Sequence, residues 1–207
     1  MLISGVDESG RGPVLGPLII SVASVEGEKQ GELSEMGVTD SKKLTASKRE
    51  ELFPEINKLC RCSSRIITAS ELNRRMGRES LNLIEAKEMG ALLKPLEGKL
   101  YLDLPERNVE HFLRKAGLAE KGIVAEHKAD LRYPIVGAAS IIAKVTRDRL
   151  VHELEERVGE KIGCGYTSDE NTIAALSNPE TRKKLKGEIR ERWSTMERIL
   201  QPKLTDF

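Results

Sequence analysis

The sequence predicts an α/β fold, with a mixed five-stranded sheet flanked by helices and a helical C-terminal extension. Three observations support this expectation. Two apolar segments lie close together near the N-terminus, short apolar runs then alternate with helical patterns, and a long run of small and β-branched residues begins at Pro134. Strands followed by alternating strands and helices are typical of a mixed sheet covered by helices.

Five segments have the short, apolar character of strands. The first two form an early pair, and the turn Gly16-Pro17 separates them. The five candidate strands are residues 2–6, 17–25, 61–68, 100–103 and 122–125.

Helical patterns occupy most of the remaining chain. Pro134 suits the first position of a helix that runs to about Arg157, with Gly159 just beyond its end. The small residues in the first half of this helix would let it lie close against the sheet. Residues 26–39 are expected to form a loop or an irregular helix. The other helical candidates begin after Thr45 or cover residues 70–94 (in two pieces broken near Gly77), 108–116 and 170–200.

Composition limits the kind of protein. The 207 residues suffice for one sizeable domain. A net charge of +1 means that nucleic-acid binding would need a local basic face. No segment approaches the roughly 20 apolar residues of a membrane span, and Arg11 interrupts the first apolar run too early for a signal peptide. Cys60, Cys62 and Cys164 indicate neither a disulfide framework nor a zinc site, so we expect free thiols and a cytoplasmic protein.

Four acidic residues stand where predicted strands end or helices begin. Asp7 and Glu8 close the first strand and run into Gly-Arg-Gly, Asp103 closes the fourth strand, and Asp130 precedes the long helix. If the strand ends converge, such carboxylates can hold two Mg²⁺ or Mn²⁺ ions and support phosphodiester hydrolysis. Acids at these places are also ordinary turn and cap residues. Taken singly, Asp103 and Asp130 favour that interpretation, whereas the Asp7-Glu8 pair favours a joint metal site.

Five motifs in order carry a family resemblance. They are Asp7-Glu8-Ser9-Gly10-Arg11-Gly12-Pro13, Asp40-Ser41-Lys42-Lys43-Leu44, Tyr101-Leu102-Asp103, His127-Lys128-Ala129-Asp130 and Ala139-Ser140-Ile141-Ile142-Ala143-Lys144-Val145. This set resembles that of ribonuclease HII, the type 2 ribonuclease H family, and the archaeal type in particular. Five ordered motifs are specific, although each alone would be weak. Ser9, Leu104 and Cys164 depart from the commonest pattern, and none of them removes a ligand.

The resemblance implies a ribonuclease H-like catalytic domain over residues 1–160 and a helical extension over 161–200 packed on it. It implies cleavage of RNA in RNA–DNA hybrids and 5′ to ribonucleotides embedded in duplex DNA, leaving 5′-phosphate and 3′-hydroxyl ends. By position, Asp7, Glu8, Asp103 and Asp130 match the catalytic metal ligands. Gly10, Arg11 and Gly12 match the loop that reads the ribose 2′-hydroxyl. Tyr166 matches the aromatic residue that packs on the following deoxyribose.

Other charged residues have two interpretations each. Lys42 fits a substrate-phosphate contact by the family pattern, whereas Lys43 is better explained as the solvated entry to a helix. Lys144, one turn from Ser140, contacts a phosphate or forms a structural ion pair. His127 carries a proton or, the favoured alternative, makes a hydrogen bond at a strand end. Residues 182–198 form a basic surface facing the duplex or an exposed helix laced with ion pairs.

The tail is a separate feature. Residues 201–207, Gln-Pro-Lys-Leu-Thr-Asp-Phe, resemble the interaction box for the sliding clamp (PCNA), with Gln201, Leu204 and Phe207 as anchors. A frayed terminus is the alternative.

The sequence therefore predicts a monomeric, Mg²⁺- or Mn²⁺-dependent endoribonuclease that acts in ribonucleotide and RNA primer removal. Two alternatives stay open. One is a non-catalytic, clamp-tethered module that binds hybrids, and the other is a different two-metal phosphodiesterase of the same superfold.

Overall fold

The computed structural model describes residues 1–38, 41, 43–106 and 108–200. The chain forms two compact units. Unit 1 comprises Met1–Ser9, Ile19–Ile66 and Glu79–Thr146. Unit 2 comprises Gly10–Leu18, Ile67–Arg78 and the chain from Arg147 onward.

The sheet of unit 1 has five strands in the order β3-β2-β1-β4-β5. Strand β1 pairs antiparallel with β2 and parallel with β4, and β4 pairs parallel with β5. The predicted mixed sheet is thus confirmed. The strands are β1 (Leu2–Ser9), β2 (Leu18–Glu26), β3 (Arg61–Ile67), β4 (Lys99–Asp103) and β5 (Ile123–Glu126).

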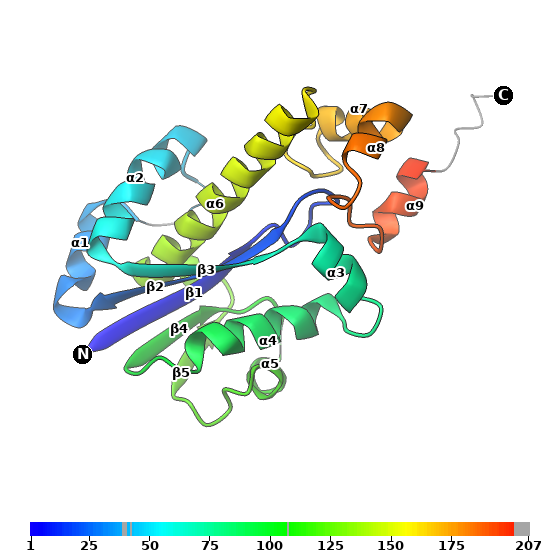
Figure 1. Ribbon diagram of the computed structural model, residues 1–207. Helices are drawn as coiled ribbons and strands as arrows, with labels where there is room; N and C mark the ends of the chain where they lie inside the picture. The colour runs from blue at the N-terminus through cyan, green and yellow to red at the C-terminus, as the bar shows by residue number, and fades with distance from the viewer. Residues whose placement is uncertain (39–40, 42, 107, 201–207) are drawn as a thin grey trace. The chain divides into compact units, whose positions relative to one another are not determined.

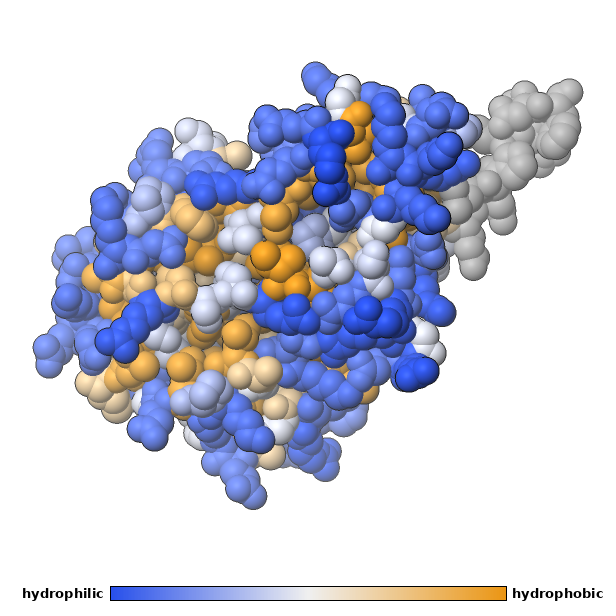
Figure 2. All heavy atoms as spheres, viewed as in Figure 1, coloured by the Kyte–Doolittle hydropathy of each residue, from blue (hydrophilic) through white to orange (hydrophobic). Residues whose placement is uncertain are grey.

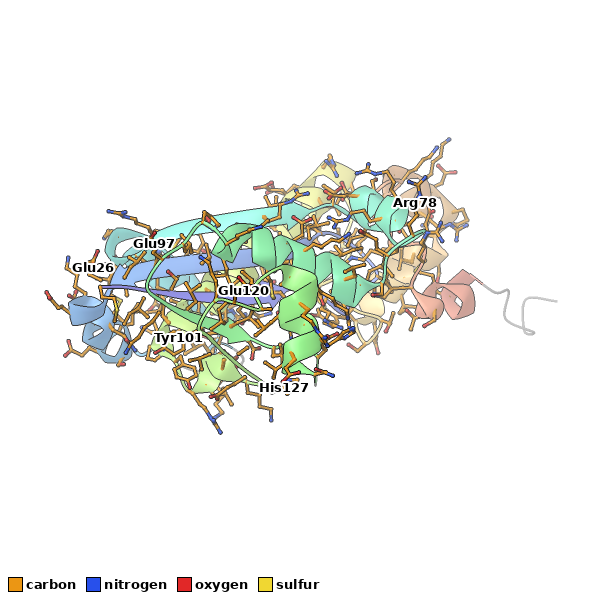
Figure 3. All side chains as sticks on the ribbon, turned by 90° about the horizontal axis from the view of Figure 1, so that it is seen from below. Glu26, Arg78, Glu97, Tyr101, Glu120 and His127 are labelled. Carbon is orange, nitrogen blue, oxygen red and sulfur yellow. The ribbon has the colours of Figure 1, made fainter. Side chains whose placement is uncertain are left out.

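Helices cover both faces of this sheet (Figure 1). One face carries α1 (Gln30–Glu35), α2 (Ala46–Leu59) and the first half of α6 (Pro134–Val158), and the other carries α4 (Leu81–Leu93) and α5 (Val109–Ala116). Figure 3, seen from below, shows α4 and α5 lying across the sheet. Of residues 26–39, the structure describes 26–38, where the 3-10 turn η1 (Gly27–Lys29) precedes α1, so the irregular helix is the alternative that holds there.

The first half of α6 packs as its small residues predict. Ala138 and Ala139 are fully buried in a cluster with β1 and β2 side chains such as Ile3 and Val25. Gly5 of β1 permits the close approach, because a Cβ atom there would lie 2.6 Å from the backbone carbonyl of Ile135. Figure 2 shows hydrophilic side chains along the outer margin of unit 1 around α1 and α2, with hydrophobic colour inward of them.

Unit 2 has its own apolar core. Val14 and Leu15 of the loop after β1 are fully buried with Leu154 of α6 and Leu176 of α7, and Trp193 packs against this cluster. An isolated bridge pairs Leu15 with Ile189. The helices of this unit are α3 (Ala69–Arg75), the second half of α6, α7 (Glu170–Ser177), α8 (Pro179–Lys184) and α9 (Ser194–Leu200).

The prediction that residues 170–200 are helical throughout is wrong in part. Three short helices occur there, and the stretch between α8 and α9 is not helical. Asn178 caps a new helix that begins at Pro179, and Gly187 has φ of +91°, a left-handed conformation that interrupts an α-helix.

Two further expectations concern cysteine and the membrane. Cys60, Cys62 and Cys164 are free thiols, as predicted. Burial, with a contribution from Cys62, raises the pKa of Cys60 to about 12, so this thiol stays protonated at neutral pH. Within the described residues, no helix combines the length and apolar character needed to cross a membrane.

Candidate active site

The parallel pairing of β1 and β4 brings two of the four acids together. Val6 stands opposite Leu102 in this register, and Asp7 and Asp103 follow these two residues directly. The charges of Glu8 and Asp103 both act on Asp7. Because the two strands run in the same direction, their C-terminal ends place these carboxylates at one edge of the sheet.

Asp130 is joined to this edge by a backbone contact. The N–H of Ala129 donates a 2.8 Å hydrogen bond to Oδ1 of Asp103. Asp130 is the next residue, within the 3-10 turn η2 (Ala129–Leu131). Its side chain is buried, and neither carboxylate oxygen has a hydrogen-bond partner. Buried polar atoms are normally hydrogen-bonded, so this carboxylate needs another kind of partner.

Asp7 is also buried, and this governs its ionisation. Burial raises the pKa of Asp7 well above its ordinary value, and the negative charges of Glu8 and Asp103 raise it further. Hydrogen bonds from the Ser140 side chain and the Glu8 N–H oppose the rise. The site therefore concentrates negative charge that a cation would relieve.

A hydrogen-bonded connection links Asp7 to the Asp40-Ser41-Lys42-Lys43 motif. The Ser140 and Ser41 hydroxyls lie 2.8 Å apart. Arg49 of α2, which is also buried, donates to the carbonyls of Ser41 and Leu44. Sequence reasoning gave Ser41 and Arg49 no role, and it noted Ser140 only for sharing a helix face with Lys144.

In unit 2, the Gly-Arg-Gly loop lies against Tyr166. A Cβ atom on Gly12 would stand 3.3 Å from Cε1 of the Tyr166 ring. Gly12 and Tyr166 are both exposed, so they form one accessible surface. The buried Gly10 has φ of +88°, a left-handed conformation that strains any residue with a side chain.

Two buried arginines hold this loop. Arg190 is fully buried, and its Nε donates a 2.8 Å hydrogen bond to the Gly16 carbonyl. Its guanidinium lies 4.9 Å from the centre of the Trp193 ring. Arg147 of α6 donates to the carbonyls of Leu15 and Cys164. Sequence reasoning missed both roles, because the residue type alone does not show whether an arginine is buried or exposed.

Comparison with known proteins identifies the family. The family model for ribonuclease HII matches residues 4–196. The chain belongs to the ribonuclease HII family. It is therefore a ribonuclease H enzyme, a nuclease that hydrolyses phosphodiester bonds, and the resemblance seen in its sequence is confirmed.

Curated ribonuclease HII relatives match over nearly the full chain. The enzyme of Methanocaldococcus jannaschii is 39% identical, over 97% of this chain and 95% of its own length. That of Archaeoglobus fulgidus is 38% identical over 99% of each chain.

Solved structures agree with this assignment. A PCNA:RNase HII complex from A. fulgidus superposes with a TM-score of 0.88 at 36% identity, covering 99% of this chain and all of that one. The ribonuclease H2 of Pyrococcus horikoshii gives 0.85 at 37% identity, covering 96% and 97%. A ribonuclease HIII in complex with Mn²⁺ gives 0.78 at 20% identity, a likeness that concerns the fold alone.

The basic run 182–198 is not the exposed helix that one interpretation required. Arg190 is fully buried and so belongs to no surface. Arg182, Lys183 and Lys186 line a pocket of about 510 Å³ whose apolar wall includes Ile189 and Met196. Arg182 also donates to the Leu176 carbonyl.

The remaining predicted residues have varied surroundings. Lys144 is half-buried on α6, and Lys43 is exposed. His127 is exposed just beyond β5, where Figure 3 labels it. Lys42 and the tail residues Gln201, Leu204 and Phe207 lie outside the described residues.

Among the described residues, the acidic side chains are not arranged as a complete metal-binding site. Within residues 1–38, 41, 43–106 and 108–200, no three His, Cys, Asp or Glu side chains are grouped so as to hold a metal ion. This fits the chemistry of Mg²⁺, which usually keeps several waters and takes one or two protein carboxylates together with substrate phosphates. The all-carboxylate donor set and the unpartnered Asp130 also suit such an ion.

Proposed function

We propose that this enzyme is a divalent-metal-dependent endonuclease that cleaves the RNA strand of RNA–DNA hybrids and nicks duplex DNA 5′ to embedded ribonucleotides. The observation that carries the proposal is the edge of unit 1 at which Asp7, Glu8 and Asp103 interact, with the buried Asp130 tied to it through Ala129. Family membership supports the same chemistry.

Four carboxylates would hold Mg²⁺ or Mn²⁺ in this proposal, namely those of Asp7, Glu8, Asp103 and Asp130. Bound there, two ions would supply charge neutralisation and an acidified water, which phosphodiester hydrolysis requires. The protein's own part is to fix the carboxylates. Ser140 and the Glu8 N–H orient Asp7, and the Ala129 N–H orients Asp103.

Recognition of the ribonucleotide falls to the surface formed by Gly12 and Tyr166. In the loop Gly10-Arg11-Gly12, the exposed Gly12 has no side chain and would allow close contact with a sugar, where the 2′-hydroxyl distinguishes RNA from DNA. The exposed Tyr166 ring supplies an apolar face for the next sugar. Lys42 and Lys144 would contact substrate phosphates.

A duplex DNA of defined sequence carrying one ribonucleotide tests the proposal. Incubation with Mg²⁺ or Mn²⁺ should give a single nick 5′ to the ribonucleotide, with 5′-phosphate and 3′-hydroxyl ends, and a chelator should prevent it. End-blocked strands separate this activity from an exonuclease, which would leave them intact. Binding without cleavage would instead support the non-catalytic module. Asp130→Asn is the matched inactive variant, because it keeps the side chain's shape.

A second proposal concerns the sliding clamp. A solved relative from A. fulgidus is in complex with PCNA, and residues 201–207 of this chain resemble the interaction box for the sliding clamp. We propose that Gln201, Leu204 and Phe207 anchor this monomeric enzyme to the clamp, for ribonucleotide and primer removal in the cytoplasm.

A further inference from the structure

Arg147 is buried where the Gly-Arg-Gly loop meets the turn that carries Tyr166. Only 2% of its surface is exposed. Its Nη2 donates a 2.9 Å hydrogen bond to the Cys164 carbonyl and a 3.3 Å bond to the Leu15 carbonyl. One side chain therefore contacts both segments.

Two glycines, Gly10 and Gly165, lie close to the Arg147 side chain. A Cβ atom on Gly10 would lie 2.6 Å from Nε of Arg147, and one on Gly165 would lie 3.1 Å from Nη2. The two glycines therefore admit the arginine between the segments. Val14 and Gly165 are joined directly as well, by a 2.8 Å backbone hydrogen bond.

Arg147 also contacts the ring of Tyr166. The guanidinium carbon lies 5.5 Å from the ring centre, within the range of a cation–π interaction. Tyr166 itself remains accessible to solvent, with 37% of its surface exposed. A guanidinium can stack and donate from several N–H groups at once, whereas a lysine ammonium is a compact point charge.

From this geometry we propose that Arg147 is a positioning residue that fixes the Tyr166 ring relative to Gly12, and thereby sets the enzyme's preference for a ribonucleotide followed by deoxyribose. The inference rests on the proposed function of Gly12 and Tyr166. Arg147 itself is buried and does not touch substrate. It acts by holding the two contacts to the ribose and the next sugar at a fixed spacing.

The test compares two substrates, a duplex DNA with one ribonucleotide and an all-RNA strand paired with DNA. In Arg147→Met, kcat/KM on the first should fall on the order of 10- to 100-fold, because misplacement of a substrate contact by about 1 Å has such an effect. The fall on the all-RNA substrate should be smaller, since no deoxyribose follows the cleaved bond there. Arg147→Lys keeps the charge and should restore the ratio of the two kcat/KM values in part.

A double-mutant cycle separates positioning from general damage. Tyr166→Ala should lower the same ratio, and adding Arg147→Met to it should lower the ratio little further, because the two residues act as one unit. The matched control is Arg157→Met on the same helix, where the arginine is exposed and paired with Glu188. This control should leave the ratio unchanged.

The outcomes distinguish the inference from the function on which it rests. If the unsubstituted enzyme does not nick the single-ribonucleotide duplex, the proposed function fails and the role of Arg147 fails with it. If it nicks but folded Arg147→Met keeps the original ratio, or loses activity equally on both substrates, only the role of Arg147 is overturned. If Arg147→Met does not fold, Arg147→Lys decides by the same ratio. Failure of both to fold would make Arg147 a folding determinant and overturn the positioning role.

Discussion

The N–H of Ala129 donates a 2.8 Å hydrogen bond to Oδ1 of Asp103, and this bond ties β4 to the turn that carries Asp130. Oδ1 of Asp103 therefore has a structural role as a hydrogen-bond acceptor. Asp103 thus combines a structural and a proposed chemical role, and substitutions can separate the two.

We expect Asp103→Asn and Asp103→Ala to lower the rate of cleavage to a similar extent, by more than about 100-fold. Each substitution removes the negative charge of a proposed metal ligand. Their stabilities should differ. The amide oxygen of Asn still accepts from Ala129, whereas Ala leaves that N–H unpaired at a cost of about 1 kcal/mol or more. Urea unfolding and a nicking assay would measure the two effects. Equal unfolding free energies for the two variants would contradict the structural role.

Asp7→Asn should stabilise the metal-free protein at neutral pH. The folded pKa of Asp7 is raised, mainly by burial, so its ionised form is disfavoured in the folded state. The resulting stability is fully present below the ordinary carboxyl pKa and is lost as pH rises through the folded pKa. Because Asn does not ionise, the variant avoids this loss of stability at neutral pH. The same substitution also removes a proposed metal ligand.

Thermal unfolding across pH, without and with Mg²⁺, checks this prediction. The advantage of Asp7→Asn should shrink as the pH falls into the acid range. Mg²⁺ should raise the unfolding temperature of the unsubstituted protein but raise that of the variant less. A variant less stable than the unsubstituted protein at pH 7 without metal would show that Asp7 is not destabilising.

Gly5→Ala should destabilise unit 1 by about 1–3 kcal/mol, because the added methyl would overlap the backbone of Ile135. Gly31→Ala is the matched control. No atom lies within 4 Å of a Cβ atom at Gly31, in helix α1, so the change should stabilise by up to about 1 kcal/mol. Urea denaturation gives both values, and the same sign for both would refute the packing argument.

Arg190→Met should lower the free energy of unfolding by about 2–3 kcal/mol, because it leaves the Gly16 carbonyl without its charged donor. The exposed Arg157→Met should change it by less than about 1 kcal/mol. Chemical denaturation measures the difference. Indistinguishable values would mean that Arg190 does not anchor the loop.

Removal of residues 201–207 should abolish binding to the sliding clamp, measured by calorimetry, while nicking in the absence of clamp stays within about twofold. Phe207→Ala should weaken binding, and Lys203→Ala, which replaces a residue outside the three anchors, should have little effect. Full clamp binding by the truncated chain would exclude the tail as the anchor.

The sequence by itself determined the pattern of strands and helices. Alternating apolar runs predicted all five strands, and Pro134 marked the start of α6 because proline suits a first helical position. The five ordered motifs were also sufficient to indicate the family. Such features are local, so the order of residues along the chain is enough to express them.

Only the tertiary structure decided which residues meet. The register of β1 with β4 sets Asp7 beside Asp103, and the loop after β1 shares its core with the chain beyond Arg147. The burial of Arg147 and Arg190 could not be predicted, because burial depends on partners distant in sequence. These two guanidinium groups lie where backbone carbonyls and aromatic rings converge to replace water, and that convergence is a property of the folded chain.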